Sequence, residues 1–380
     1  MAERPRIILH AGMHKTGSTA IQERFGTHGV PGVAVPGVAV SGGPRANLSD
    51  IVLLLFAEGP LLDKIHAARW PHLSRRALLR ARARSRDQLA AQIGAWLADG
   101  TAPRFLISAE DISAPDFDRA AVARMAAFFG QFGGQFGAET HVHAYVRAPA
   151  SFMQSAFQQR VKQEKPGAVD LDAANLWPRY RARFEPLDDV LGPDRVHLRA
   201  FDPDAFTGSD VVADFAGWLG VDPVTAPPAR ANDGLSCEAV CVVFCRLAGL
   251  LPEEYPAPDL AARVRATPAR ALAGFGTRRF AFSRAFLDPA RAAQRADLDW
   301  IEARLGQTLP DRRLPDRQAP GAAPGSAADM RMVAETCRDD LCRFLAQAPP
   351  PPTGPRQALT RLVRRLRTGL RRGLGRPGEA

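Results

Sequence analysis

Two short segments carry residue types that suit the binding of a phosphate group. The first, residues 7–19, reads Ile-Ile-Leu-His-Ala-Gly-Met-His-Lys-Thr-Gly-Ser-Thr, and a helical pattern follows from Ala20 to Phe25. An apolar strand that passes through a glycine-flanked turn into a helix aims several backbone N–H groups and the positive end of the helix dipole at one point. We expect a phosphate to bind at that point.

The lysine of this turn is placed differently from the lysine of a nucleoside-triphosphate loop. In the pattern GxxxxGK[ST] the lysine follows the second glycine and reaches the β- and γ-phosphates. Here Ser18 follows Gly17, and the lysine is Lys15, inside the turn. The sequence therefore predicts a loop that holds one phosphate at its mouth, and not the metal-bound tail of a triphosphate. The loop residues are Lys15, Thr16, Gly17, Ser18 and Thr19.

The second segment begins at residues 141–146, which alternate as His-Val-His-Ala-Tyr-Val and predict a strand. Arg147 closes this strand, and a helix is expected from about Ala150 to Lys162, with Pro149 near its first turn. Ser155 lies in that helix, eight residues after the arginine.

Together the two segments resemble the sulfotransferase family that uses 3′-phosphoadenosine 5′-phosphosulfate (PAPS). In that family the first loop binds the 5′-phosphosulfate, and a strand-end arginine with a serine eight residues later binds the 3′-phosphate. The resemblance therefore implies that Lys15 to Thr19 bind the 5′-phosphosulfate. It implies that Arg147 and Ser155 bind the 3′-phosphate, the arginine through a bidentate fork, with Lys162 a weaker candidate. The family's Arg-Lys-Gly loop is not recognisable, and residues 274–279 match it only loosely.

The resemblance also implies a reaction, in which a sulfuryl group moves to a hydroxyl or amine of an acceptor, with a carbohydrate expected and no metal required. Lys15 is the candidate for stabilising charge on the leaving phosphate oxygen. The acceptor needs a general base, and Glu110 is the candidate because it follows the predicted strand 104–108. The pair Glu110 and Asp111 could instead cap a helix or form a salt bridge. His10 and His14, which flank the loop, are the rival bases.

The order of predicted elements indicates a P-loop-like three-layer α/β fold, in which helices flank a central parallel sheet. Strand candidates alternate with helical patterns, and phosphate sites of such sheets lie at the carboxyl ends of the strands, where Lys15, Glu110 and Arg147 all fall. The strand candidates are 6–11, 104–108, 141–146 and 195–199, and residues 27–47 are expected to form a loop with one short strand.

The chain divides into a main α/β domain, residues 1–348, and a C-terminal segment, residues 349–380, that begins with a proline-rich break. Within the main domain, residues 60–100 form a helical insertion that is expected on the acceptor side. The net charge is +10, but residues 354–380 alone contain eight arginines and one glutamate. Because the rest of the chain is nearly neutral, we expect no nucleic acid as a partner.

Residues 354–380 pattern as a basic amphipathic helix, which suits an anionic membrane surface. A solvated tail or a helix docked on the body fits the same pattern. The longest apolar runs, 51–57 and 239–245, are far too short to span a bilayer. Cys237, Cys241 and Cys245 share one helical face and are expected to be buried thiols in a reduced, cytoplasmic setting.

The sequence is also compatible with two other classes of protein. The first is a P-loop kinase or another nucleoside-triphosphate enzyme, which the position of Lys15 and the lack of a clear Walker B aspartate oppose. The second is a non-catalytic basic protein that binds a membrane or a nucleic acid through residues 354–380.

Overall fold

The computed structural model describes most of the chain, and every structural statement here concerns the described residues. These are residues 4–13, 15–38, 47–165, 167–222, 234–252, 255, 258–311 and 324–347. His14 and the whole segment 349–380 lie outside them. The prediction that His14 is a rival base and the predicted membrane contact of residues 354–380 therefore stay predictions.

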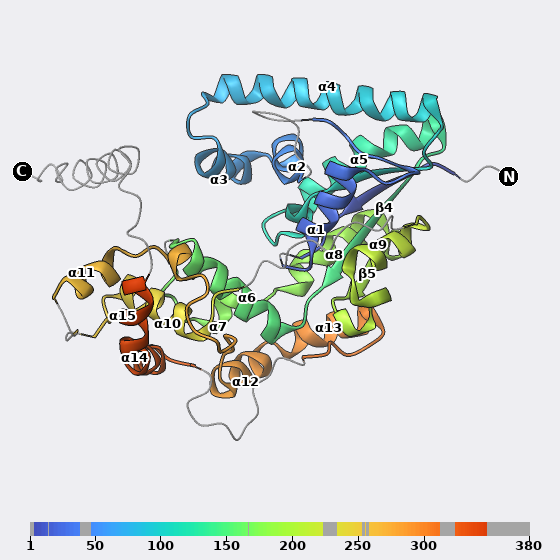
Figure 1. Cartoon of the computed structure of the whole chain (residues 1–380). Helices are drawn as coiled ribbons and strands as arrows, with labels where there is room; N and C mark the ends of the chain where they lie inside the picture. Colours follow the sequence, from blue (N-terminus) through green and yellow to red (C-terminus); the bar gives the residue numbers. More distant parts are fainter. Residues whose placement is uncertain are drawn as a thin grey trace, which may run out of the picture.

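A five-stranded parallel sheet forms the centre of the fold (Figure 1). Its strand order is β2-β3-β1-β4-β5, so β1 lies in the middle, between β3 and β4. The four predicted strands and the short strand expected within residues 27–47 are confirmed. The strands are β1 (Arg6–His10), β2 (Val33–Ala34), β3 (Arg104–Ser108), β4 (Glu139–Val146) and β5 (Val196–Ala200).

Helices cover both faces of the sheet, which confirms the three-layer arrangement. Alternate residues of a strand point to opposite faces, and β1 shows this directly. Ile7 and Leu9 belong to the larger core, which includes side chains of α2, α4, α5 and α8, whereas Ile8 packs in the smaller core with α1 and α9. The helices are α1 (Ser18–Gln22), α2 (Ser49–Phe56), α4 (Arg75–Asp99), α5 (Arg119–Phe136), α8 (Tyr180–Leu191) and α9 (Val211–Leu219).

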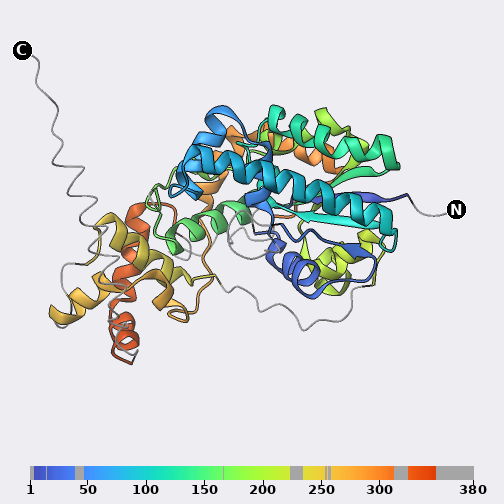
Figure 2. The same cartoon turned by 90° about the horizontal axis from the view of Figure 1, so that it is seen from above.

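The predicted insertion, residues 60–100, is helical as expected and consists mainly of α3 (Gly59–Arg69) and α4. The Ser74 hydroxyl accepts a hydrogen bond from the Ala77 N–H and so caps the start of α4, and Gly100 ends it in the left-handed conformation. One stripe of α4 is buried against the sheet, and its Trp96 contacts Phe105 of β3 at 5.3 Å between ring centroids. Figure 2 shows α4 as the long helix on the outside of this face.

A second group of helices continues from α6 (Pro149–Lys162), which follows β4. At its centre, α10 (Cys237–Ala248) contacts both α6 and α14 (Ala327–Thr336). All five cysteines are buried and unpaired by disulfides, so the prediction of buried thiols is confirmed. The other members are α7 (Ala173–Leu176), α11 (Pro258–Ala266), α12 (Arg284–Ala293) and α15 (Arg338–Gln347). Helix α13 (Arg295–Leu305) follows α12 and packs on α8 and β5.

No helix among the described residues has both the length and the apolar composition needed to cross a bilayer.

Candidate functional site

The loop after β1 lies at the carboxyl end of the central strand of the sheet. The helix after β1 packs in the smaller core, and the helices after β4 pack in the larger one. The carboxyl ends of β1 and β4 therefore form a topological switch point, where ligands of open α/β sheets bind. Two hydrogen bonds fix the loop beside β4, from Ala11 N–H to the His143 carbonyl at 2.8 Å and from Met13 N–H to the Tyr145 carbonyl at 3.2 Å.

The turn itself depends on two residues in the left-handed region. Lys15 has a φ of 70° and Gly17 a φ of 80°. Gly17 adopts this conformation without a penalty from a side chain, whereas a lysine there is strained and must be held by its surroundings. The Gly17 carbonyl then accepts from the N–H groups of Ala20 and Ile21 at 2.9 and 3.2 Å, which starts α1 directly after the turn.

Polar side chains converge on the space beside Gly12. A Cβ atom at this position would lie 2.9 Å from Thr16 Oγ1, 3.1 Å from His10 Nε2 and 3.3 Å from Ser18 Oγ. His10 Nε2 is buried and has no hydrogen-bond partner among the described residues. Because buried polar atoms are normally paired, this atom indicates a place where an oxygen atom of a bound anion fits.

Arg147 joins the second predicted motif to the loop. Its Nη1 donates to the Lys15 carbonyl at 2.6 Å, and its Nε donates to Ser151 Oγ at 2.9 Å. The Tyr180 hydroxyl donates to the Arg147 carbonyl at 2.6 Å and anchors the end of β4. The two motifs are 132 residues apart in the sequence and form one site in the fold. The bond to the Lys15 carbonyl also supports the left-handed conformation of that residue.

The structure pairs Arg147 with Ser151 and not with Ser155. Ser155 lies one helical turn further along α6 and is partly buried. Sequence analysis missed Ser151, although its place four residues after the arginine, in the first turn of a helix that Pro149 begins, was a usable signal. The 3′-phosphate role of Arg147 and Ser155 stays a prediction.

Lys15 and Lys162 approach each other at the mouth of the loop. The pKa of Lys15 is lowered first by partial desolvation of its ammonium group and then by the charges of Lys162 and Arg147, whereas Glu110 acts in the opposite direction. A concentration of positive charge at one end of a sheet favours an anionic ligand.

Glu110 lies beside this loop, at the carboxyl end of β3, where the sequence placed it. The Ala109 N–H donates to the His10 carbonyl at 2.9 Å and extends the pairing of β3 with β1, after which residues Glu110–Ser113 form a short 3₁₀ turn. The pKa of Glu110 is raised from 4.5 to about 7, first by burial and then by the charge of Asp111, whereas the nearby Lys15 ammonium and a hydrogen bond with the Ser18 hydroxyl act to lower it. A carboxyl group with this pKa exchanges protons near neutral pH.

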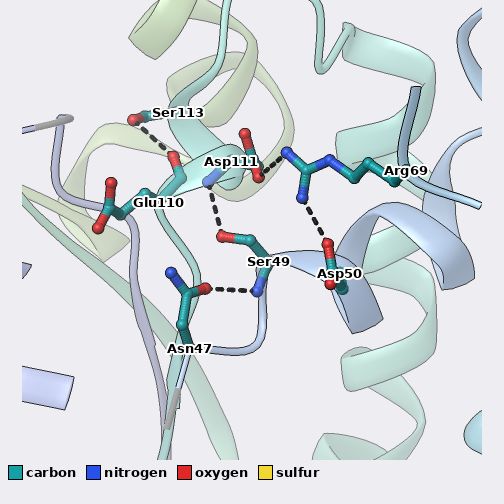
Figure 3. A network of polar contacts seen from close by, with 7 residues as sticks. All are labelled: Asn47, Ser49, Asp50, Arg69, Glu110, Asp111 and Ser113. Carbon is teal, nitrogen blue, oxygen red and sulfur yellow. Dashed lines mark hydrogen bonds and ion pairs between the residues drawn. The ribbon is translucent and has the colours of Figure 1, made fainter. Parts of the chain in front are cut away.

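Asp111 has different surroundings from Glu110, although the two residues are consecutive. Figure 3 shows its carboxylate turned toward Arg69 of α3 and the Glu110 carboxyl group turned to the opposite side. Arg69 Nη2 lies 2.7 Å from Asp111 Oδ2, and Arg69 Nη1 lies 2.6 Å from Asp50 Oδ1. The structure therefore places Asp111 in the salt bridge that the sequence considered for the pair.

His10, one of the rival bases, is fully buried beneath the loop. Its Nδ1 lies 2.8 Å from Ser108 Oγ, and burial lowers its pKa to about 3. The ring is therefore neutral at physiological pH. With Nε2 beside Gly12, it lies where it can contact a bound anion.

The segment 274–279, the loose match to the Arg-Lys-Gly loop, packs on the second group of helices. The Cys237 N–H donates to the Arg278 carbonyl at 2.8 Å, and Arg278 Nε lies 2.6 Å from Glu238 Oε1. Residues 275–278 line an open cavity of about 960 Å³ together with side chains of α14 and α15. Figures 1 and 2 both show α10 and α14 apart from α1, so this segment does not join the loop after β1.

Comparisons with known proteins give a distant likeness in structure and none in sequence. No protein-family model and no curated protein matches the chain. A sulfotransferase from Alicyclobacillus acidocaldarius is similar at a TM-score of 0.40 and 16% identity, over 80% of this chain and 97% of that one. A sulfotransferase domain from the curacin biosynthetic pathway is similar at a TM-score of 0.30 and 16% identity, over 59% of this chain and 78% of that one. Likeness this distant assigns no activity to the chain.

Proposed function

We propose that this protein is a PAPS-dependent sulfotransferase that moves the sulfuryl group to a hydroxyl or amine of an acceptor, with a carbohydrate as the expected acceptor. One observation supports this most strongly. The lysine loop and the strand-end arginine, which lie in distant segments of the sequence, are joined by the 2.6 Å hydrogen bond from Arg147 Nη1 to the Lys15 carbonyl. In this proposal both motifs bind phosphates at a single site, at the switch point of the sheet.

The loop fits the phosphosulfate end of the proposed donor. Gly12 leaves the space that a side chain would fill, and the buried atom His10 Nε2 has no partner there among the described residues. The Thr16 hydroxyl donates to the Met13 carbonyl at 2.6 Å and holds the loop. The exposed Lys15 and Thr19 complete the mouth of the loop.

When bound, PAPS supplies the sulfuryl group and a phosphate leaving group. In the proposed step the Glu110 carboxylate takes the proton of the acceptor hydroxyl as the acceptor oxygen bonds to sulfur. The bond between sulfur and the bridging phosphate oxygen breaks, and Lys15 donates a charge-assisted hydrogen bond to that oxygen. Arg147 and Ser155 hold the 3′-phosphate in this proposal. The pKa of Glu110, raised to about 7 by burial, suits a base that must release its proton again at neutral pH.

A ligand-binding comparison tests the proposal without knowledge of the acceptor. We expect adenosine 3′,5′-bisphosphate to raise the melting temperature of the protein, and ATP with magnesium to have little effect. The increase should be lost in Lys15→Ala and kept in Lys64→Ala, a matched control whose lysine pairs with Asp116 on the surface. Stabilisation by ATP with magnesium alone would contradict the proposal and favour a nucleoside-triphosphate enzyme.

A further inference from the structure

We propose that the Arg69–Asp111 ion pair controls the charge next to Glu110, in a turn that holds the Glu110 carboxyl group toward the phosphate loop. The pair is one of several contacts that hold the turn after β3, and it determines the charge behind that carboxyl group. The inference rests on the proposed function only for the use of Glu110 as a base. The effect of the pair on Glu110 itself is a property of the fold and can be measured separately.

The guanidinium group of Arg69 bridges two carboxylates from different elements. It lies 2.7 Å from Asp111 Oδ2 and 2.6 Å from Asp50 Oδ1, which belongs to α2 (Figure 3). The Asp111 side chain is only 13% exposed, so this pair is better shielded from solvent than an ordinary surface salt bridge. A planar fork that contacts two carboxylates also restricts both of them in orientation.

The backbone of Asp111 is held as well as its side chain. The Asp111 N–H donates to Ser49 Oγ at 3.3 Å, and the Ser49 N–H donates to Asn47 Oδ1 at 2.9 Å. On the other side of the turn, Arg183 Nη1 of α8 donates to the Ser113 carbonyl at 2.7 Å. The turn is therefore attached to three helices, α2, α3 and α8, none of which belongs to the phosphate loop.

This attachment determines where Glu110 points. In a short turn, consecutive side chains leave the backbone in different directions, and Figure 3 shows those of Glu110 and Asp111 on opposite sides. Because Asp111 is fixed toward Arg69, Glu110 is directed to the other side, where Lys15 and Ser18 act to lower its pKa. The hydrogen bonds to Ser49 and from Arg183 still hold the backbone of the turn when the ion pair is removed, so its removal changes chiefly the charge behind Glu110.

The pair also affects the charge around Glu110. Among the described residues, the charged groups that act on Glu110 are Asp111 on its own turn and Lys15 on the loop, and behind Asp111 lie Arg69 of α3, Asp50 of α2 and Arg183 of α8. After burial, Asp111 is the main influence that raises the pKa of Glu110. Arg69 partly neutralises Asp111, so removal of Arg69 and removal of the Asp111 charge should have opposite effects on Glu110.

The test is a measurement of the Glu110 pKa in three proteins, the parent, Arg69→Gln and Asp111→Asn. In each background the free energy of unfolding is compared, as a function of pH, between the chain with Glu110 and the same chain with Glu110→Gln. The pH at which this difference levels off reports the pKa of Glu110 in the folded state, whether or not the protein has activity.

We expect the pKa to rise in Arg69→Gln and to fall in Asp111→Asn, by about 0.5–1 pH unit each, the effect of one charge at close range in a partly hydrated site. Arg75→Gln is the matched control, because Arg75 pairs with Asp63 at 2.6 Å in the same insertion and should leave the pKa unchanged. Arg69→Lys retains the charge and should keep the pKa close to that of the parent.

Shifts in the same direction for both variants, or no shift in Asp111→Asn, would overturn the inference. If Arg69→Gln does not fold, the pKa of Glu110 in Arg69→Lys and Asp111→Asn still tests the inference. The proposed function is tested separately by turnover of PAPS in the parent. A parent with no turnover but with opposite pKa shifts in the variants would contradict the sulfotransferase proposal and leave the effect of the ion pair on Glu110 intact.

Discussion

Replacing Glu110 with glutamine should remove activity and at the same time stabilise the fold. Burial raises the pKa of this carboxyl group from 4.5 to about 7. An acid whose pKa is higher in the folded state than in the unfolded state destabilises the fold once the pH exceeds its unfolded pKa, because the folded protein must then bury a charge. Glutamine has nearly the same shape and carries no charge, so Glu110→Gln avoids this cost.

The expected size of the effect follows from the two pKa values. The linkage relation gives a gain from Glu110→Gln of about 1 kcal/mol at pH 5 and about 3 kcal/mol at pH 8. Because the group is only partly buried, we regard these figures as upper values. Turnover should fall by roughly 10²–10⁴, the usual contribution of a general base. Any residual activity should lack the acidic limb near pH 7.

The assay is denaturant unfolding of parent and variant at several values between pH 5 and pH 8, together with a pH–rate profile. Asp116→Asn is a suitable control, since Asp116 is an exposed carboxylate that pairs with Lys64. A Glu110→Gln protein that is less stable than the parent at pH 8 would refute the argument from burial. A variant with normal turnover would show that Glu110 is not the base. That result would not contradict the proposed role of the phosphate loop.

Four further predictions concern the loop and the sheet beneath it. Lys15→Ala should lower PAPS turnover by about 10²–10³, or about 3 kcal/mol, with an unchanged circular dichroism spectrum, and a variant that keeps more than half of the parental rate would exclude the role of Lys15. Arg147→Ala should weaken binding of adenosine 3′,5′-bisphosphate in calorimetry and reduce its preference over the 3′-dephospho analogue, whereas an unchanged preference would place the 3′-phosphate elsewhere. Gly12→Ala should abolish nucleotide binding, because the added Cβ would lie 2.9 Å from Thr16 Oγ1. Gly37→Ala is the control and should bind the nucleotide normally, since no atom lies within 4 Å of its Cβ. Equal binding by both variants would argue against an anion beside Gly12. The buried rings of His10 and His143 have lowered pKa values, chiefly through burial. The stability that these neutral rings contribute is therefore complete above the unfolded pKa near 6.5 and is lost as the pH falls below it, so His143→Phe should reduce the loss of unfolding free energy between pH 7 and pH 5.5 by about 1.3 kcal/mol. An equal loss in parent and variant would contradict this prediction.

The sequence was sufficient to predict the strands and turns that are determined by local residue patterns. Alternation and apolar runs indicated the strands that became β1, β3, β4 and β5, and the turn before α1 followed from the glycines that flank it. The left-handed conformation of Lys15 did not follow from its residue type. The carboxyl ends of parallel strands meet at one edge, so the closeness of Lys15, Glu110 and Arg147 could also be predicted.

Contacts that depend on the packing of distant elements could not be predicted in this way. The ion pair of Arg69 with Asp111 joins residues 42 positions apart, and Arg69 ends an ordinary-looking helix with no motif around it. The different surroundings of Glu110 and Asp111 likewise depend on which side of the turn faces the loop. The pKa of Glu110 follows from burial, which is a property of the assembled core and not of the local sequence.

The most direct test of the central claim is a crystal structure of the protein with adenosine 3′,5′-bisphosphate bound. We expect the 5′-phosphate in the loop between Gly12 and Thr19, within hydrogen-bonding distance of Lys15 Nζ, and the 3′-phosphate beside Arg147 and Ser155. A 5′-phosphate bound outside this loop, or a loop that accepts only the phosphates of a magnesium-bound nucleoside triphosphate, would contradict the account.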